Sequence, residues 1–222
     1  MSSLLTAFSY NMEAYPELPT YPAHNTLQDD MGYVLDIDPG YILHSSLVQI
    51  LSDIVLRVSD SAVIPMNVTH YGTMMRAGLA GVQKNIDSVL GANETELLKS
   101  SIEDFTKAAE DFQKQIDAKD RNNMTEFEVL EINDKLIRLS RAFIYEGGLL
   151  HRSQYRNLLI APHPDNLNEE VVFPGLAGNL GSDPSEERVQ LSRELVILVV
   201  AVKRARDILL DDFGPNLIRD EL

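Results

Sequence analysis

The stretch TEFEVLEINDKLIRLSRAFIYEGG, residues 125–148, decides the fold class of this chain. It opens with Thr125 and Glu128, the spacing of a capping box, in which a threonine and a glutamate satisfy free backbone N–H groups at a helix start. Apolar residues then recur three or four positions apart, at Val129, Ile132, Leu136, Leu139 and Phe143. Gly147 and Gly148 supply a left-handed stop. The pattern predicts an amphipathic helix packed along one face.

Similar patterns precede this helix. Asn93 and Glu96 have the spacing of a second capping box, and the apolar residues Leu98, Ile102, Phe105, Ala109, Phe112 and Ile116 follow on one face. A less regular helix is expected over residues 68–90. Further upstream, a stripe at helical spacing is made by Leu43, Leu47, Ile50, Leu51, Ile54 and Val58. The sequence predicts that this stripe is buried and that its helix ends before Pro65.

A last helix is expected near the C-terminus. Asp183 suits the N-cap, Pro184 the first helical position, and Glu186 the first turn. The residues expected to point inward are Val189, Leu195, Leu198, Val202, Ala205 and Leu209. The fold class predicted is therefore all-α, a bundle of four or five helices over residues 39–222. Residues 1–38, rich in Pro and Tyr, are expected to form an extended arm.

A long crossover separates the last two helices and contains QYRNLLIAPHPDNLNEEVVFPGL, residues 154–176. Connections in compact bundles are usually short, so a crossover of this length is expected to be ordered. Apolar residues flank its polar centre, at Leu158, Leu159, Ile160, Val171, Val172 and Phe173. Because these side chains are costly to leave in water, we expect them to pin both ends of the crossover to the helices.

Composition narrows the class of protein. The chain has 222 residues, a formal net charge of −15 and no cysteine. This charge disfavours nucleic acid and anionic membranes as partners, and the lack of cysteine excludes disulfides. No apolar run approaches the roughly 20 residues that span a bilayer, and no signal peptide is recognisable at the start. We therefore expect a cytoplasmic protein.

Two features favour the lumen of the endoplasmic reticulum as an alternative. The chain ends in Arg-Asp-Glu-Leu at residues 219–222, and Asn-x-Thr sequons occur at Asn67, Asn93 and Asn123. Both features require entry into the secretory pathway. Helix N-caps account for two of the sequons equally well, so the cytoplasmic interpretation is preferred.

The segment RAFIYEGGLLHRSQYRNLLIAP, residues 141–162, followed by FPG at residues 173–175, resembles a known family. The family is the transferrin receptor-like dimerisation domain, the C-terminal helical domain of the transferrin receptor and glutamate carboxypeptidase II group. The resemblance covers roughly residues 40–212. The positions that match the family are Arg141, Ala142, Phe143, Gly148, Leu149, Arg152, Tyr155, Arg156, Ala161, Pro162, Phe173, Pro174 and Gly175. It implies a helical fold and a homodimer.

The resemblance also implies what this chain lacks. In such enzymes a zinc peptidase domain and an apical domain precede this domain, and neither is expected among the 222 residues of this chain. A Tyr-Pro-x-Tyr-His-Ser motif carries the last zinc-binding histidine, but the matching stretch has His24 at the tyrosine position and Asn25 at the ligand position. A Lys-Tyr pair that grips the substrate is replaced by Leu167 and Asn168. The resemblance therefore argues against zinc peptidase activity in this chain alone.

Few residues suggest chemistry of their own. The five histidines include no His-Glu-x-x-His motif, and no calcium loop or phosphate loop is recognisable, so neither a metal nor a cofactor is expected. An imidazole beside a carboxylate can act as an acid or base. The candidate catalytic residues are His24, His70, Tyr71, His163 and Asp165.

Three functions are compatible with these observations. The leading hypothesis is a stand-alone, non-peptidase helical domain that forms a homodimer. The second is a metal-free enzyme that cyclises or isomerises a small apolar molecule in a biosynthetic pathway, in a pocket lined by the candidate residues. The third is a subunit that completes a separately encoded zinc peptidase.

Overall fold

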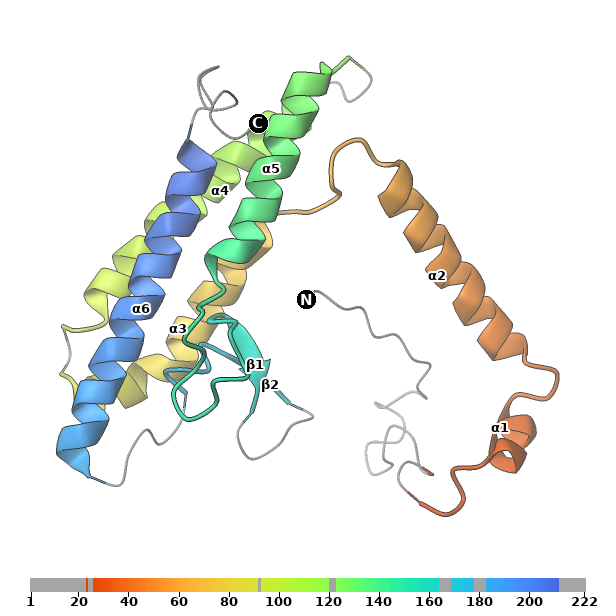
Figure 1. Cartoon of the computed structure of the whole chain (residues 1–222), viewed down its shortest axis with the longest axis horizontal. Helices are drawn as coiled ribbons and strands as arrows, with labels where there is room; N and C mark the ends of the chain where they lie inside the picture. The colour runs from red at the N-terminus through yellow and green to blue at the C-terminus, as the bar shows by residue number, and fades with distance from the viewer. Residues whose placement is uncertain are drawn as a thin grey trace. The chain divides into compact units, whose positions relative to one another are not determined.

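The computed structural model of the chain describes residues 23, 26–91, 93–119, 123–163, 169–177 and 183–211 (Figure 1). The chain divides into two compact units, Met1–Ser61 and Ala62–Leu222. This boundary lies well after Asp38, where the sequence suggested a change from arm to bundle. Because most of the expected arm lies outside the described residues, the division into residues 1–38 and 39–222 stays a prediction.

The first unit contains two helices, α1 (Met31–Ile37) and α2 (Ile42–Asp60). The carboxylate of Asp30 accepts a hydrogen bond from the backbone N–H of Tyr33 and caps α1. Residues 31–37 therefore differ from the extended arm expected of them, because a single aspartate N-cap suffices to start one helical turn. Neither α1 nor α2 contains a buried residue. The expected burial of the α2 stripe is thus wrong for the isolated chain.

The second unit is a helical bundle of α3 (Thr69–Val89), α4 (Glu96–Ala118), α5 (Glu126–Ala142) and α6 (Pro184–Leu210). Helix α4 packs against α3 and α6, and α5 packs against α6. The segment between α5 and α6, residues 143–183, is called the connector. It contains the short strands β1 (Ile160–Pro162) and β2 (Glu170–Val172), which pair antiparallel with Ile160 opposite Val172. The all-α prediction is confirmed, and this small hairpin was not expected.

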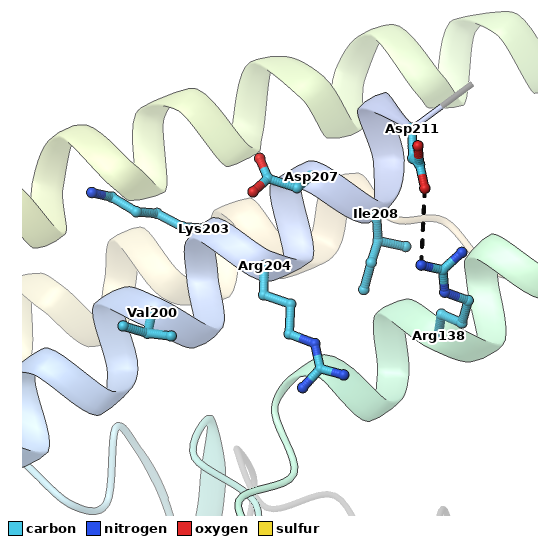
Figure 2. A pocket seen from close by; sticks show the side chains of 7 residues that line it. All are labelled: Arg138, Val200, Lys203, Arg204, Asp207, Ile208 and Asp211. Atoms are coloured by element: carbon cyan, nitrogen blue, oxygen red, sulfur yellow. Dashed lines mark ion pairs between the residues drawn. The ribbon is translucent and has the colours of Figure 1, made fainter. Parts of the chain in front are cut away.

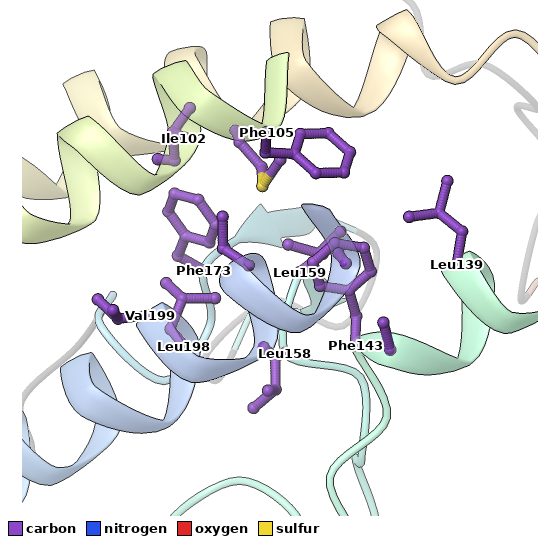
Figure 3. Close-up of a cluster of buried hydrophobic side chains, with 14 of the residues drawn as sticks. Ile102, Phe105, Leu139, Phe143, Leu158, Leu159, Phe173, Leu198 and Val199 are labelled. Carbon is purple, nitrogen blue, oxygen red and sulfur yellow. The ribbon is translucent and has the colours of Figure 1, made fainter. Parts of the chain in front are cut away.

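The core of the bundle lies between the four helices and the connector (Figure 3). Phe105 of α4, Phe143 at the end of α5 and Phe173 of the connector are all fully buried. Every inward residue expected on α4 is buried, and on α6 all but Val189 are. Val189 is 69% exposed because, at about 100° per residue, it lies on the side of α6 opposite the others.

Of the three helix caps predicted from the sequence, two are confirmed and one is wrong. The capping box of α5 is present, with Thr125 and Glu128 satisfying each other's backbone N–H groups. Asp183 caps α6 through the N–H of Ser185, with Pro184 in the first turn. The capping box expected at Asn93 is wrong. Helix α4 begins at Glu96 with Thr95 as N-cap, so Glu96 lies too early in the helix to reach back.

The end of α5 also differs from expectation. The helix stops at Ala142, ahead of the two glycines expected to end it. Gly148 does have a positive φ of 67°, but it serves a turn inside the connector. The reason is visible in the backbone hydrogen bonds, since the chain beyond Phe143 pairs with a later part of the connector rather than continuing the helix.

Candidate functional site

The first half of the connector folds back on itself through backbone hydrogen bonds. The N–H of Leu158 donates to the carbonyl of Phe143 at 2.9 Å, and the N–H of Tyr145 donates to the carbonyl of Arg156 at 2.8 Å. The turn between them needs a glycine, because a Cβ at Gly148 would lie 2.3 Å from the carbonyl oxygen of Ser153. These hydrogen bonds and the glycine therefore hold this loop in one defined conformation.

In the second half, residues 159–163 pair with residues 169–173, and we call this paired segment the neck of the connector. The N–H of Phe173 donates to the carbonyl of Leu159 at 2.9 Å, and the N–H of His163 donates to the carbonyl of Glu169 at 2.7 Å. The guanidinium of Arg152 donates to the carbonyl of Pro162 at 2.7 Å and ties the neck to the first loop. These bonds extend the pairing of β1 with β2 in both directions.

The connector is pressed against two helices. A Cβ at Gly78 of α3 would lie 2.3 Å from Cγ1 of Val172, so the helix and β2 are in close contact. On the other side, a Cβ at Gly175 would lie 2.5 Å from Oε2 of Glu194 on α6. Leu158, Leu159 and Phe173 are buried, as Figure 3 shows. The expectation that apolar residues pin both ends of the connector is confirmed for these three.

Glu194 is unusual among the residues that hold the connector. Its side chain is only 4% exposed. Burial raises the pKa of its carboxyl group, and the nearby Arg193 opposes this only in part. No hydrogen bond to this carboxyl group is found among the described residues. Burial of this kind makes the charged form of the carboxyl group more costly, and the group lies against the backbone of Gly175 in the connector.

The candidate catalytic residues are not gathered into one site. His24 and Asp165 lie outside the described residues. His70 is exposed, and His163 lies half-buried at the neck of the connector. Tyr71 stacks on Phe143 with 5.7 Å between ring centroids, and burial raises the pKa of its phenol. Within the described part of the chain, no three His, Asp or Glu side chains are grouped so as to hold a metal ion.

A different feature distinguishes one side of the bundle. On α3 no large apolar side chain is exposed, and on α4 only Leu97 is. On α5, on α6 and two residues beyond α5, by contrast, several are 37–69% exposed. Besides Phe127 and Leu210 at the far ends of the two helices, these are Leu130, Ile137, Ile144, Val189, Val196 and Val200. We call these six residues the outer surface of α5 and α6. On α5 they recur at a spacing of seven residues, which aligns them along one side of a helix.

A groove of about 560 Å³ runs between α5 and α6 near the C-terminal end of α6 (Figure 2). Val200 and Ile208 form its apolar part, and Lys203 and Arg204 lie along its edge. Arg138 of α5 reaches Asp211 across the groove at 4.0 Å. A smaller hollow of about 180 Å³ lies between α3 and α4 and includes Arg76 and Lys99. Neither hollow includes a candidate catalytic residue.

Helix α2 has a start that its sequence pattern did not predict. The carboxylate of Asp38 accepts hydrogen bonds from the backbone N–H groups of Leu43 and His44, each at 3.0 Å, and its Oδ2 lies 2.6 Å from Nδ1 of His44. Burial alone raises the pKa of Asp38, but the bonds to His44 and Leu43 outweigh it and hold the pKa at about 2. The only signal in the sequence was an aspartate before Pro39-Gly40.

Much of the surface of α2 is apolar. Its exposed large apolar residues are Ile42, Leu43, Val48, Ile50, Ile54, Val55, Leu56 and Val58. Among the described helices, α2 is the one that is long and apolar enough to cross a membrane, judged by length and composition alone. Core helices of soluble proteins pass the same test. The expectation of no membrane partner therefore stays a prediction.

Comparison with known proteins shows which family this fold and these surfaces belong to. The family model of the transferrin receptor-like dimerisation domain matches residues 94–210. Aminopeptidase NAALADL1 of Rattus norvegicus is 27% identical over 92% of this chain. Probable glutamate carboxypeptidase LAMP1 of Arabidopsis thaliana is 28% identical over 77% of the chain, and probable glutamate carboxypeptidase VP8 of Zea mays is 23% identical over 87%. The chain spans 28%, 25% and 28% of the length of these relatives, respectively.

Proposed function

Because the chain belongs to the family of transferrin receptor-like dimerisation domains, we propose that it acts as a non-peptidase helical module that forms a homodimer. The surface that pairs is the outer surface of α5 and α6. Two copies related by a two-fold axis present the same surface to each other, which is the usual arrangement of a homodimer.

The uneven distribution of exposed apolar residues carries this proposal. The outward side of α4 is charged, with residues such as Glu103, Lys107 and Lys114, and it suits water. The outward sides of α5 and α6 carry exposed leucine, isoleucine and valine, although the core beneath them is complete. An apolar surface of this kind marks a contact site, and dimer interfaces are more apolar than the rest of a protein surface.

The groove between the two helices adds charge to this surface. Lys203 and Arg204 stand beside Val200, and Asp207 and Asp211 lie further along the same groove. Opposite charges arranged on either side of a two-fold axis can pair across an interface and fix how the two copies are oriented. The charged residues of the groove therefore support a dimer of one defined orientation rather than nonspecific association through apolar side chains.

The non-peptidase part of the proposal has separate support. The residues that match the family, 94–210, form helices and the connector. The sequence places asparagine at Asn25, where the resemblance implies a zinc-binding histidine, and asparagine is a poor zinc ligand.

Size-exclusion chromatography with light scattering tests the pairing surface. The full chain with both Ile137→Asp and Val196→Asp is expected to run as a monomer, because two-fold symmetry puts each aspartate into the interface twice. The matched control is Leu97→Asp, which changes an exposed leucine on α4 and is expected to leave the dimer intact. A double variant that dimerises like the unmodified chain would refute the proposed surface.

A further inference from the structure

The exposed residues of α5 follow a regular spacing. From residue 130 to residue 144 the exposed positions are Leu130, Asp134, Ile137, Arg141 and Ile144, each three or four residues from the next. We call these five residues the α5 stripe. Its spacing aligns the first four along one side of the helix, and Ile144 continues the line two residues beyond the end of α5. Residues at this spacing are those that contact a second helix.

The order of charges along the α5 stripe makes it complementary to itself. Asp134 lies three residues before Ile137, and Arg141 lies four residues after it. Leu130 and Ile144 each lie seven residues from Ile137. Two antiparallel copies of α5 with a two-fold axis at Ile137 therefore set the apolar ends of the stripe against each other. The same axis sets the acid of each copy against the base of the other, and it makes each contact twice.

Other arrangements of the same two helices match poorly. In a parallel pair each residue faces its own copy, so Asp134 meets Asp134 and Arg141 meets Arg141, and like charges repel. In an antiparallel pair shifted by three or four residues, Ile137 faces either the acid or the base of the second copy. A charge buried against an apolar side chain loses water without gaining a partner. The α5 stripe therefore favours one orientation and one register.

Both charged residues of the α5 stripe are accessible to a second copy. The side chain of Asp134 is 51% exposed, and its ion pair with Arg138 on the same helix measures 3.6 Å. Because an exposed pair of this kind contributes little, its carboxylate remains able to accept from another guanidinium. Arg141 is exposed, and its side chain has no ion pair or hydrogen bond with the residues that the structure describes. Its planar guanidinium suits a carboxylate.

Helix α6 is less complementary to itself than α5. A two-fold axis midway between Val196 and Val200 pairs these two valines across the interface. The same axis brings Arg193 of one copy toward Arg204 of the other, where like charges repel. An axis at Val200 instead pairs Arg193 with Asp207. It then sets Val196 against the charged Arg204, so no single axis satisfies both the apolar and the charged residues of α6.

We propose that two copies of the chain pair through antiparallel α5 helices, with the two-fold axis at Ile137 and with Asp134 of each copy bound to Arg141 of the other. This orientation rests on the proposed homodimer and specifies which helix lies at its axis. The apolar residues of the α5 stripe supply the contact area, and the two charged residues select the antiparallel partner. Helix α6 flanks the axis.

Cysteine cross-linking tests the orientation. The chain has no cysteine, so an introduced thiol has no competitor. Ile137→Cys is expected to form an intermolecular disulfide on mild oxidation, because the axis sets its two copies side by side. Leu130→Cys alone is expected not to, because its two copies would lie about 21 Å apart along the antiparallel helices. Leu130→Cys combined with Ile144→Cys is expected to cross-link again.

The cross-linking pattern also identifies the alternatives. A parallel pair would cross-link Leu130→Cys and Ile137→Cys alike. A dimer through another surface would cross-link neither of them. Either pattern would overturn the proposed orientation.

Charge reversal tests the two charged residues. Asp134→Arg and Arg141→Asp are each expected to raise the dissociation constant of the homodimer by about tenfold or more, because each creates like-charge pairs at two symmetric places. The double variant is expected to return to within about threefold of the unmodified chain. Lys107→Glu, a charge reversal on the exposed side of α4, is the matched control and is expected to leave the dissociation constant unchanged.

These measurements separate the orientation from the homodimer itself. Light scattering of the unmodified chain at the same concentrations reports whether a dimer forms at all. A dimer in which the double variant is no stronger than the single ones, or in which Ile137→Cys does not cross-link, would overturn the orientation and leave the homodimer standing. A monomer at every concentration would overturn both.

Discussion

The carboxyl group of Glu194 on α6 lies against the backbone of Gly175, so close that a Cβ on the glycine would be 2.5 Å from Oε2. This contact joins the last helix to the far end of the connector. Both groups are unusual choices, since only glycine leaves room for the carboxyl group and an acid is rarely buried this deeply. The stability of the connector should therefore respond both to pH and to small changes of volume.

Glu194→Gln is expected to stabilise the fold at neutral pH by about 1 kcal/mol, because the amide keeps the shape without the cost of a buried charge. The pKa of Glu194 is raised in the folded chain. The folded state is thus relatively favoured at low pH, and this advantage is lost as pH rises from the unfolded pKa through the raised one. Urea unfolding of both proteins at pH 4 and pH 7 measures the effect. A gain that is equal at both pH values would contradict it.

Two glycines of α3 are expected to respond oppositely to alanine. Gly78→Ala should cost about 1–3 kcal/mol, because its Cβ would meet Val172 at 2.3 Å and push β2 away. Gly81→Ala should gain about 0.5–1 kcal/mol, because nothing lies within 4 Å and alanine favours the helix. Thermal unfolding compares the two variants directly. Equal effects would show that the connector is not docked on α3.

The helix caps give a second paired test. Thr125→Ala is expected to cost about 1 kcal/mol, since the Thr125 side chain accepts from the N–H of Glu128 in the capping box of α5. Asn93→Ala is expected to change stability by less than about 0.5 kcal/mol, since Asn93 does not cap α4. Denaturant unfolding measures the loss of stability in each variant. A larger loss for Asn93→Ala than for Thr125→Ala would contradict the assignment of both helix starts.

The start of α2 should resist acid. The pKa of Asp38 is held at about 2, below its ordinary value of 3.8, so its bonds to Leu43 and His44 are fully present above pH 3.8 and are lost as pH falls through 2. The carboxyl carbon of Asp38, followed by NMR, is expected to titrate near pH 2. Titration of Asp38 at or above 3.8 would rule out the capping arrangement.

Much of the bundle could be predicted because its helices carry regular apolar stripes. The residues expected inward on α4 are all buried, and Thr125 and Asp183 cap the helices expected of them. Periodicity fails where the chain turns. Gly148 was expected to end α5, but its positive φ serves the connector, because the pairing of Phe143 with Leu158 takes over from the helix first.

The surfaces were harder to predict than the core. The stripe of α2 and that of α4 look alike in the sequence, yet one is exposed and the other buried. A stripe shows that a helix needs a cover and does not show which molecule supplies it. Likewise, Tyr71 is a chemically plausible catalytic residue in the sequence, but the fold places its ring in a stack with Phe143. Only the folded chain distinguishes these outcomes.

The molar mass of the unmodified full chain, measured by light scattering across a dilution series, tests the central claim most directly. A homodimer through the outer surface of α5 and α6 should show twice the mass of one 222-residue chain at about 10 μM and should dissociate only on dilution. The mass of a single chain over the whole concentration range would contradict the proposed homodimer.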